Sequence, residues 1–288
     1  MIREYPMDVG KAGPSFRSSK GLFTYSVGQQ LIASLLSTAA GASLNESMHL
    51  VHPKIDNTRF SYTGRSYGSG SSVGLTDYLI RNSLDAISYN YTERGYMANV
   101  TCIYNATSNF TLSPVSGSAN AADGTLPDSV DGGEKLDYIG LDPKAIVAMG
   151  VAYSELSSRR FVAIAAGEYY AHLNNTQCEL DFNPWLFAVT VDLKKLNILV
   201  EPKASTIDFD PKRNLTRTVA RQFSLLSRDS TSLYDSMLGQ ALNASIAAYS
   251  ITMGGSWPPL TQEQQTLGGL TNSVTAMADD MLVAYGAA

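Results

Sequence analysis

The chain is short of the side chains that build metal sites and basic surfaces. Its 288 residues include only 2 cysteines and 3 histidines, and its 21 Lys and Arg residues are outnumbered by 26 Asp and Glu residues. The net charge of −5 and the lack of any Lys and Arg cluster argue against nucleic-acid binding. A zinc site needs more ligands than these, and no cofactor motif rises above chance, so we predict no metal and no cofactor.

Long hydrophobic runs are missing as well. No stretch of 18 apolar residues occurs, and the opening MIREYPMDVGKAG lacks the apolar segment of a signal peptide. The overall composition, with 44% hydrophobic and 16% charged residues, is nevertheless ordinary for a globular protein. The chain is therefore long enough and apolar enough to bury a sizeable core.

N-glycosylation sequons are in excess. With 15 asparagines, 33 serines and 21 threonines, chance predicts about three N-x-[ST] triplets. The chain has eight, at Asn45, Asn90, Asn99, Asn105, Asn109, Asn174, Asn214 and Asn243. We therefore expect N-linked glycans and a location on the extracellular or luminal face of a membrane, in the secretory pathway or at the plasma membrane. The alternative is that polar loops alone account for the triplets.

This location conflicts with the lack of a targeting segment. We expect the targeting and membrane-anchoring segments to lie outside this chain, either because it is a fragment of a longer protein or because the gene model starts late. In an oxidising compartment Cys102 and Cys178 would pair, and closing a loop of about 75 residues would stabilise the fold by roughly 4 kcal/mol. Two buried free thiols are the alternative.

The hydrophobic pattern predicts an α+β protein with a mainly antiparallel sheet. We expect an irregular arm over residues 1–20 and one domain over residues 21–288, with strands concentrated in 58–203 and helices in 211–288. A helix over about residues 22–40 would flank the sheet on the N-terminal side. A further helix is expected over residues 75–87.

Several strands can be placed by period-two alternation. In the strand from about Gly95 to Tyr104, Cys102 faces inward and Asn99 faces outward. Two hairpins follow within residues 145–170 and 185–202, with the pairs Arg159-Arg160 and Lys194-Lys195 as solvated turn charges. The acidic stretch from Ser113 to Asp137 lacks calcium-loop spacing and is expected to be a solvated loop.

Three helices are expected after Asp210-Pro211. The first carries a stripe of apolar residues from Leu215 to Leu226, and Asp229 or Ser230 could cap its continuation. Thr261 and Gln264 form a capping box for the last helix. Its buried stripe would contain Leu267, Leu270, Val274, Met277 and Met281.

Several longer segments resemble one family. They are GRSYGSGSSVGLTDYLIRN, YNYTERGYMANVTCIYNATSNF, AAGEYY, CELDFNPWLFAVTVD and LLSRDSTSLYDSMLG. Together they resemble a family of uncharacterised filamentous-fungal membrane glycoproteins, over roughly Leu22 to the C-terminus. The resemblance implies the extracytoplasmic body of a membrane-anchored protein, and it carries no catalytic residue.

The strongest catalytic pattern is GRSYG, residues 64–68, which matches the G-x-S-x-G motif of serine hydrolases. If the match were functional, Ser66 would be the nucleophile and His172 the base, oriented by Asp181 or Asp192. The chain is rich in Gly and Ser, however, and hairpins followed by helices do not suit a hydrolase of alternating strands and helices. A secreted serine hydrolase is therefore the alternative function.

Other patterns are weaker. The turn GSGSSVG, residues 68–74, could hold an anion on its N–H groups but is expected to be a structural turn. His49 and His52 are expected to be surface residues. The tyrosines between Tyr62 and Tyr104 could form a binding surface or belong to half-buried strands.

We therefore predict a non-enzymatic extracytoplasmic domain of a membrane-anchored fungal glycoprotein, with a role in binding a ligand or a cell-wall polymer. Its partners would be a membrane, through segments outside this chain, N-linked glycans and an unidentified protein or polysaccharide. A binding site is expected away from the glycan-bearing face of strand 95–104. The turn at 64–74 and the tyrosines beside it are the first place to look.

Overall fold

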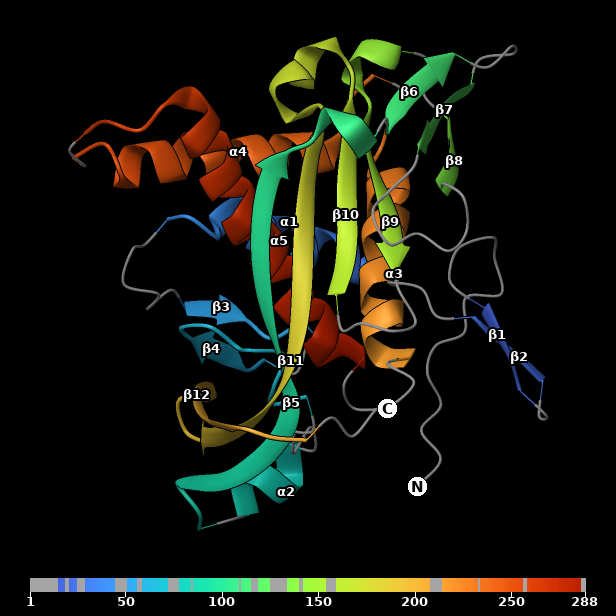
Figure 1. Ribbon diagram of the computed structural model, residues 1–288. Coiled ribbons are helices and arrows are strands. Elements are labelled where there is room, and N and C mark those ends of the chain that lie inside the picture. Colours follow the sequence, from blue (N-terminus) through green and yellow to red (C-terminus); the bar gives the residue numbers. More distant parts are fainter. Residues whose placement is uncertain are drawn as a thin grey trace.

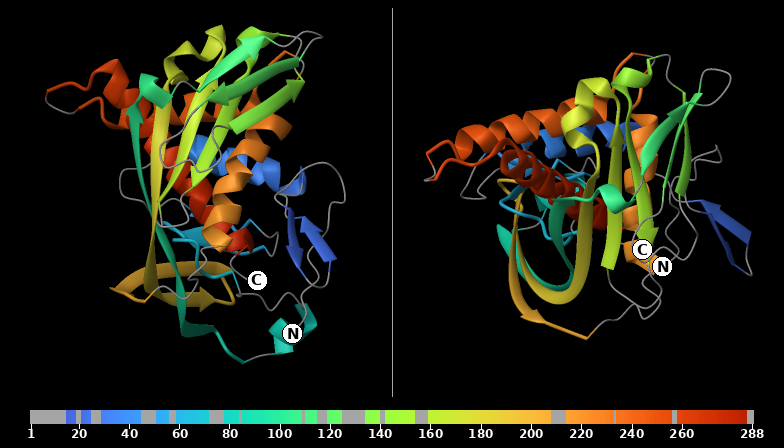
Figure 2. Two further views of the ribbon diagram at one scale, coloured as in Figure 1. Left: turned by 45° about the vertical axis from the view of Figure 1, so that its right-hand side comes forward. Right: turned by 45° about the horizontal axis from the view of Figure 1, so that its top comes forward.

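The computed structural model describes residues 15–18, 21–24, 29–44, 51–55, 59–71, 78–83, 85–108, 110–114, 119–124, 134–139, 142–153, 159–207, 214–232, 234–255 and 258–285 (Figure 1). They form the predicted α+β fold, in which a mostly antiparallel sheet lies against helices from both ends of the chain. Figures 1 and 2 show α1, α3, α4 and α5 gathered on one face of this sheet.

The helices are α1 (Gln29–Gly41), α2 (Tyr78–Ser83), α3 (Asn214–Asp229), α4 (Met237–Thr252) and α5 (Gln262–Tyr285), with 3-10 turns η1 (Ala106–Ser108), η2 (Pro143–Ala145) and η3 (Glu168–Leu173). The strands are β1 (Ser15–Ser18), β2 (Gly21–Thr24), β3 (Val51–Pro53), β4 (Ser61–Thr63), β5 (Ser88–Tyr104), β6 (Thr111–Pro114), β7 (Ala119–Gly124), β8 (Glu134–Ile139), β9 (Val147–Tyr153), β10 (Arg159–Ala166), β11 (Thr176–Asp192) and β12 (Asn197–Ser205).

The main sheet is organised around β11. On one side of β11, β10 pairs with its first half and β12 pairs with its second half. The sheet continues from β10 to β9, and from β12 to β4 and then β3. On its other side β5 runs antiparallel to it over the full 17 residues. Only β4 and β12 pair in parallel among the described strands of this sheet. In the described part of the chain no strand pairs with the outer edge of β5, which leaves that edge open to other elements.

Strands β5 and β11 change the face that they bury part-way along. In one half, Ala98 and Cys102 of β5 and Phe182 of β11 are buried. In the other half, Phe187 and Val189 of β11 are buried, so the inward positions switch from even to odd numbers. The register against β12 shifts between Leu186 and Phe187, a bulge that bends the sheet. The right-hand view of Figure 2 shows both strands curling at this end.

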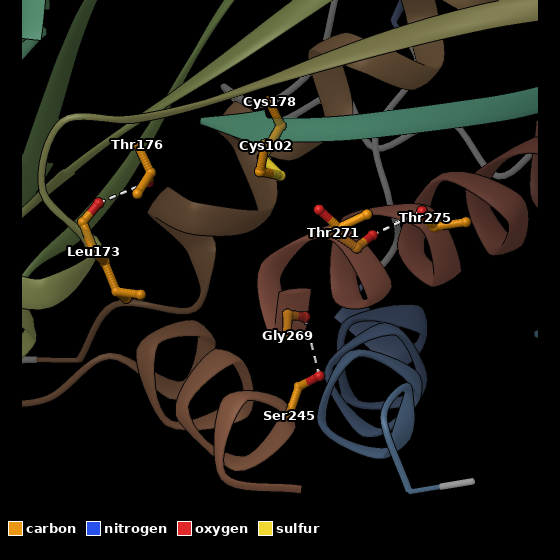
Figure 3. Close-up of a disulfide and its surroundings, with 8 residues drawn as sticks. All are labelled: Cys102, Leu173, Thr176, Cys178, Ser245, Gly269, Thr271 and Thr275. Atoms are coloured by element: carbon orange, nitrogen blue, oxygen red, sulfur yellow. Dashed lines mark hydrogen bonds between the residues drawn. A yellow bond between two sulfur atoms is a disulfide. The ribbon is translucent and has the colours of Figure 1, made fainter. Parts of the chain in front are cut away.

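The predicted disulfide between Cys102 and Cys178 is confirmed. The two residues lie opposite each other on β5 and β11, and their sulfur atoms are 2.03 Å apart. Figure 3 shows the bridge on the side of the two strands that is turned toward α5, where Thr271 and Thr275 lie. The bridge fastens the two longest strands together beneath the helix that they support.

The predicted hairpins and the predicted last helix also match the structure. Strands β9 and β10 are buried on both faces, because α3 covers one and Phe110 packs against the other. At the start of α5, Thr261 Oγ1 accepts from the N–H of Gln264 at 3.2 Å and Gln264 Oε1 accepts from the N–H of Thr261 at 2.9 Å. Within the described residues, no helix has both the length and the apolar character needed to cross a bilayer.

The predicted N-terminal part needs correction. Helix α1 begins at Gln29 and not near residue 22, because residues 21–24 form strand β2, which pairs with β1. The arm expected over residues 1–20 therefore contains a strand at residues 15–18. Of the helix expected over 75–87, the structure describes residues 78–83 as helix α2, residues 85–87 are not helical, and Leu79 is 78% exposed. The apolar spacing there does not mark a packed face.

Three further predictions need correction, and in the first of them strand pairing outweighs weak local propensity. Three short strands, β6, β7 and β8, occupy much of the segment expected to be a loop from Ser113 to Asp137. Neither Asp229 nor Ser230 caps the second C-terminal helix, because α4 begins at Met237 and the side chain of Ser236 accepts from the N–H of Gly239. The expected turn residue Arg160 is buried on β10, where its guanidinium donates to Thr216 Oγ1.

Candidate functional site

A pocket of about 690 Å³ lies between the open edge of β5 and the helices α1, α4 and α5. Residues 98–100 of β5 form one wall and residues 64–66, which follow β4, form another. The remaining walls come from α1 and the residues just after it, from α4 and the turn after it, and from one face of α5 between Asn272 and Asp280. The volume falls in the range of small-molecule sites in proteins.

An ion pair between Arg65 and Asp279 closes one side of the pocket. Arg65 Nε donates to Asp279 Oδ2 at 2.6 Å and Arg65 Nη2 donates to Asp279 Oδ1 at 3.1 Å. The guanidinium also donates to the carbonyl of Ala98 on the open edge of β5 at 2.6 Å, and it lies 4.6 Å from the ring centroid of Tyr67. Burial alone would lower the pKa of Arg65, but the neighbouring carboxylate outweighs burial and raises it. Arg65 is therefore charged, and its charge is paired with Asp279.

Asp280, the next residue on α5, has no such partner. Its side chain is 2% exposed, and Oδ2 forms no hydrogen bond within the described residues. Burial raises the pKa of Asp280 to about 7; a hydrogen bond with Thr38 opposes this shift and the charge of Asp279 adds to it. The pocket thus contains a carboxyl group that titrates near neutral pH.

His52 on β3 also lines the pocket. Its Nε2 lies 3.2 Å from the carbonyl oxygen of Gly64, and its ring stacks on Tyr62 with centroids 5.3 Å apart. Because Nε2 faces a carbonyl it carries the proton, so Nδ1 is an acceptor, and none of the described residues donates to it. Burial lowers the pKa of His52, which favours the neutral ring. His52, which was expected at the surface, is half-buried, and His49 lies outside the described residues.

Ser66 lies in the pocket wall, but the structure does not give it a base. Its side chain is 1% exposed, and Oγ has no hydrogen-bond partner in the described part of the chain. His172 lies on η3, where its Nε2 is 2.7 Å from Asn243 Oδ1 and its carbonyl accepts from Tyr104. Arg65, next to Ser66, contacts Ala98, and the six-residue step along β5 from Ala98 to Tyr104 spans about 20 Å. Ser66 and His172 are therefore not brought together.

The other parts of the predicted triad lie elsewhere too. Asp192 accepts from the backbone N–H groups of Lys194 and Lys195 in the turn before β12. Asp181 is opposite Asn99 in the β5–β11 register and accepts from Asn183. A turn, and not a helix, follows Ser66 as far as residue 71. The G-x-S-x-G match thus lacks the strand–turn–helix setting of a nucleophile elbow.

An N–H group of the glycine-rich turn binds the side-chain carboxylate of Glu93. Gly64, Gly68 and Gly70 have positive φ angles, which glycine adopts readily. The N–H of Gly70 donates to Glu93 Oε2 at 2.9 Å, and Tyr91 donates to the same oxygen at 3.3 Å. Burial raises the pKa of Glu93, and these hydrogen bonds oppose that shift. The turn expected over residues 68–74 is described as far as Ser71, and its N–H group binds a carboxylate from β5.

The tyrosines near this turn pack against the core. Tyr62 and Tyr96 are each 1% exposed, and the hydroxyl of Tyr62 donates to the carbonyl of Ser69 at 2.7 Å. Tyr67 stacks on Phe187, with ring centroids 5.6 Å apart. The one tyrosine in the pocket wall is Tyr249 of α4. These clustered tyrosines therefore contribute to core packing and do not line the pocket.

The sequon asparagines differ in their surroundings. Asn90 and Asn99 of β5 are exposed, and Asn99 also borders the pocket, although a site was expected away from it. Three others are half-buried with Oδ1 in hydrogen bonds: Asn105 accepts from Thr107, Asn174 accepts from Ala166 and Asn243 meets His172. Asn214 begins α3, and Asn45 and Asn109 lie outside the described residues. Glycosylation of all eight stays a prediction.

Sequence reasoning missed Arg65, Asp279 and Asp280. One signal was available, because Asp279 and Asp280 are the only charged residues between Leu267 and Tyr285 and lie beside the apolar stripe of α5. Within the described residues, no three Cys, His, Asp or Glu side chains come together as a metal-binding group. The chain matches no protein family, no curated protein and no solved structure. The fungal glycoprotein resemblance thus stays a prediction.

Proposed function

We propose that this chain is an extracytoplasmic, N-glycosylated domain that binds a small molecule in the pocket between β5 and the helices. The observation that carries the proposal is the pocket itself, in which Asp280 Oδ2, His52 Nδ1 and Ser66 Oγ belong to wall residues and lack protein partners. Buried polar groups without partners cost free energy, so a protein tends to retain them where a ligand or a water molecule completes them.

The cellular setting is part of the same proposal. The disulfide favours an oxidising compartment, and the exposed sequons at Asn90 and Asn99 are accessible for glycans. By its resemblance to fungal membrane glycoproteins, the domain would be held at the extracellular or luminal side of a membrane by segments outside this chain. A pocket of about 690 Å³ has the size of a site for a low-molecular-weight ligand, whereas a cell-wall polymer needs a longer groove.

Ligand binding is tested with a variant that fills the pocket. A fragment library is screened by ligand-observed NMR against residues 1–288 and against Ala276→Phe, in which a large ring enters the pocket from α5. Ala247→Phe on the exposed side of α4 is the matched control. We expect hits that are retained by Ala247→Phe and lost with Ala276→Phe. If no hit depends on position 276, the pocket is not a binding site.

The setting is tested separately by expression in a glycosylating host. We expect a mass loss on enzymatic deglycosylation, glycopeptides that contain Asn90 and Asn99, and no free thiol in the unfolded, unreduced protein. An unchanged mass together with two free thiols would remove the secretory part of the proposal and leave the pocket part standing.

A further inference from the structure

The charges around the pocket do not cancel. The titratable side chains in its wall are His52 from β3, Arg65 from the turn after β4, Tyr249 from α4, and Asp279 and Asp280 from α5. Arg65 and Asp279 neutralise each other through two hydrogen bonds. Burial favours the neutral form of His52. The wall residues contributed by α1 and β5 carry no charge. Ionised Asp280 therefore gives the pocket one uncompensated negative charge.

The polar atoms left without partners are suited to a donor. His52 Nδ1 is an acceptor, Asp280 Oδ2 is an acceptor when ionised, and Ser66 Oγ can accept. A primary ammonium group has three N–H donors and no acceptor, so it can donate to acceptors of this kind. The positive charge of Arg65 is already paired with Asp279, and the guanidinium also donates to the carbonyl of Ala98, so the wall favours a cationic ligand over an anionic one.

The rest of the wall is largely apolar. Val100 of β5, Ala276 of α5 and Met253 after α4 contribute aliphatic surface, and Tyr249 contributes an aromatic ring. Aromatic faces attract cations and pack against apolar groups. A bare metal ion would find one free carboxylate here, fewer than hard cations require. The site therefore favours an organic body with one cationic end.

We propose that the pocket binds an organic amine, whose ammonium group pairs with Asp280 and whose apolar body packs against the aliphatic and aromatic wall. This inference rests on the proposed small-molecule function and names the chemical class of its ligand. Asp280 supplies the charge selectivity, because burial makes an unpaired carboxylate costly and a matching cation correspondingly favourable.

Binding is expected to depend on pH. The pKa of Asp280 is raised to about 7 by burial, so at lower pH the free site is protonated and a proton must leave before the amine binds. Affinity should therefore rise with pH and level off above pH 7. Between pH 5.5 and pH 8 the expected gain is about thirtyfold. Arg65 stays charged over this range, and burial lowers the pKa of His52, which favours its neutral form.

Three probes of nearly the same shape separate charge from size. They are 2-phenylethylamine, 2-phenylethanol and phenylacetate, which carry charges of +1, 0 and −1 at pH 8. Binding of each to residues 1–288 is measured by ligand-observed NMR titration, together with n-hexylamine as an aliphatic amine. Asp280→Asn tests the carboxylate, and Glu263→Gln at an exposed position of the same helix is the control.

We expect both amines to bind, the alcohol and the acid to bind at least tenfold more weakly, and Asp280→Asn to reduce amine affinity at least tenfold. Glu263→Gln should match the unsubstituted protein. The inference is overturned if neither amine binds at millimolar concentration, if the alcohol or the acid binds equally well, or if Asp280→Asn has no effect. Neutral or anionic library hits that Ala276→Phe abolishes would keep the binding function and reject the amine.

Discussion

Arg65 and Asp279 lie 214 residues apart in the sequence and form a two-point ion pair, with N–O distances of 2.6 and 3.1 Å. The pair joins the turn after β4 to α5, and through the carbonyl of Ala98 it also holds the open edge of β5. Three segments from distant parts of the chain therefore meet at one guanidinium. The positive charge of Arg65 is paired with Asp279, so Arg65 does not neutralise Asp280, the neighbouring residue in the pocket wall.

Removal of Arg65 should be strongly destabilising. Arg65→Met keeps the aliphatic volume but leaves Asp279, whose side chain is 3% exposed, without its cation. Breaking one side of a buried pair costs about 3 kcal/mol of unfolding free energy. Urea unfolding measures the loss, and Arg94→Met at an exposed position of β5 should stay within about 0.5 kcal/mol of the unsubstituted protein. Equal stabilities of the two variants would show that the ion pair contributes little.

Asp280 should make the protein less stable as the pH rises. Its pKa is about 7 in the folded protein and 3.8 without burial, so the folded state binds the proton more tightly than the unfolded state. For such a group, stability is greatest below pH 4 and declines as the pH increases to 7, by roughly 4 kcal/mol. Asp280→Asn should remove this decline and raise the melting temperature at pH 8.

Asp280→Asn is compared with the unsubstituted protein by thermal unfolding at several pH values, without ligand. If both proteins show the same pH dependence between pH 4 and 8, Asp280 is not the group that titrates. Other buried carboxyls such as Glu93 contribute in the same direction, because burial raises the pKa of Glu93 as well. The difference between the two proteins therefore isolates position 280.

Much of the fold could be predicted from local patterns. Alternation in the 145–202 region gave the correct hairpins, and the capping box of Thr261 and Gln264 gave the start of α5. Alternation could not show that β5 and β11 exchange their buried faces, because each half reads as a normal strand. The register shift against β12 between Leu186 and Phe187 and the stacking of Tyr67 on Phe187 depend on residues far apart in the sequence, so both are tertiary effects.

The pocket was harder to predict than the sheet. Residues 64–66 were singled out for Ser66, whereas the charged group that closes the pocket is its neighbour Arg65. The sequence around His52 gave no sign that its ring stacks on Tyr62. The partners of Arg65 and His52 are long-range, and one sequence without an alignment carries no information on such pairs.

Gly68 in the turn should not tolerate a side chain. Its φ angle is +65°, and a Cβ atom there would clash with Cβ of Leu282 on α5. Gly68→Ala combines backbone strain with a clash against a buried helix, so a loss of about 2 kcal/mol or more is expected. Gly255→Ala is the control, because no atom lies within 4 Å of the added Cβ. Urea midpoints that shift equally in the two variants would contradict the packing of this turn against α5.

The hydrolase alternative makes its own prediction about Ser66. A nucleophilic serine requires a base within hydrogen-bond reach, and Ser66 Oγ has no hydrogen-bond partner within the described residues. We therefore expect a fluorophosphonate probe to leave Ser66 unlabelled at pH 8, in residues 1–288 and in Ser66→Ala alike. Intact mass and peptide mapping provide the measurement, and a known serine hydrolase in the same reaction shows that the probe is active. Labelling that depends on Ser66 would mean that the pocket rearranges to bring a base to it, and His52, which shares its wall, would be the first base to substitute.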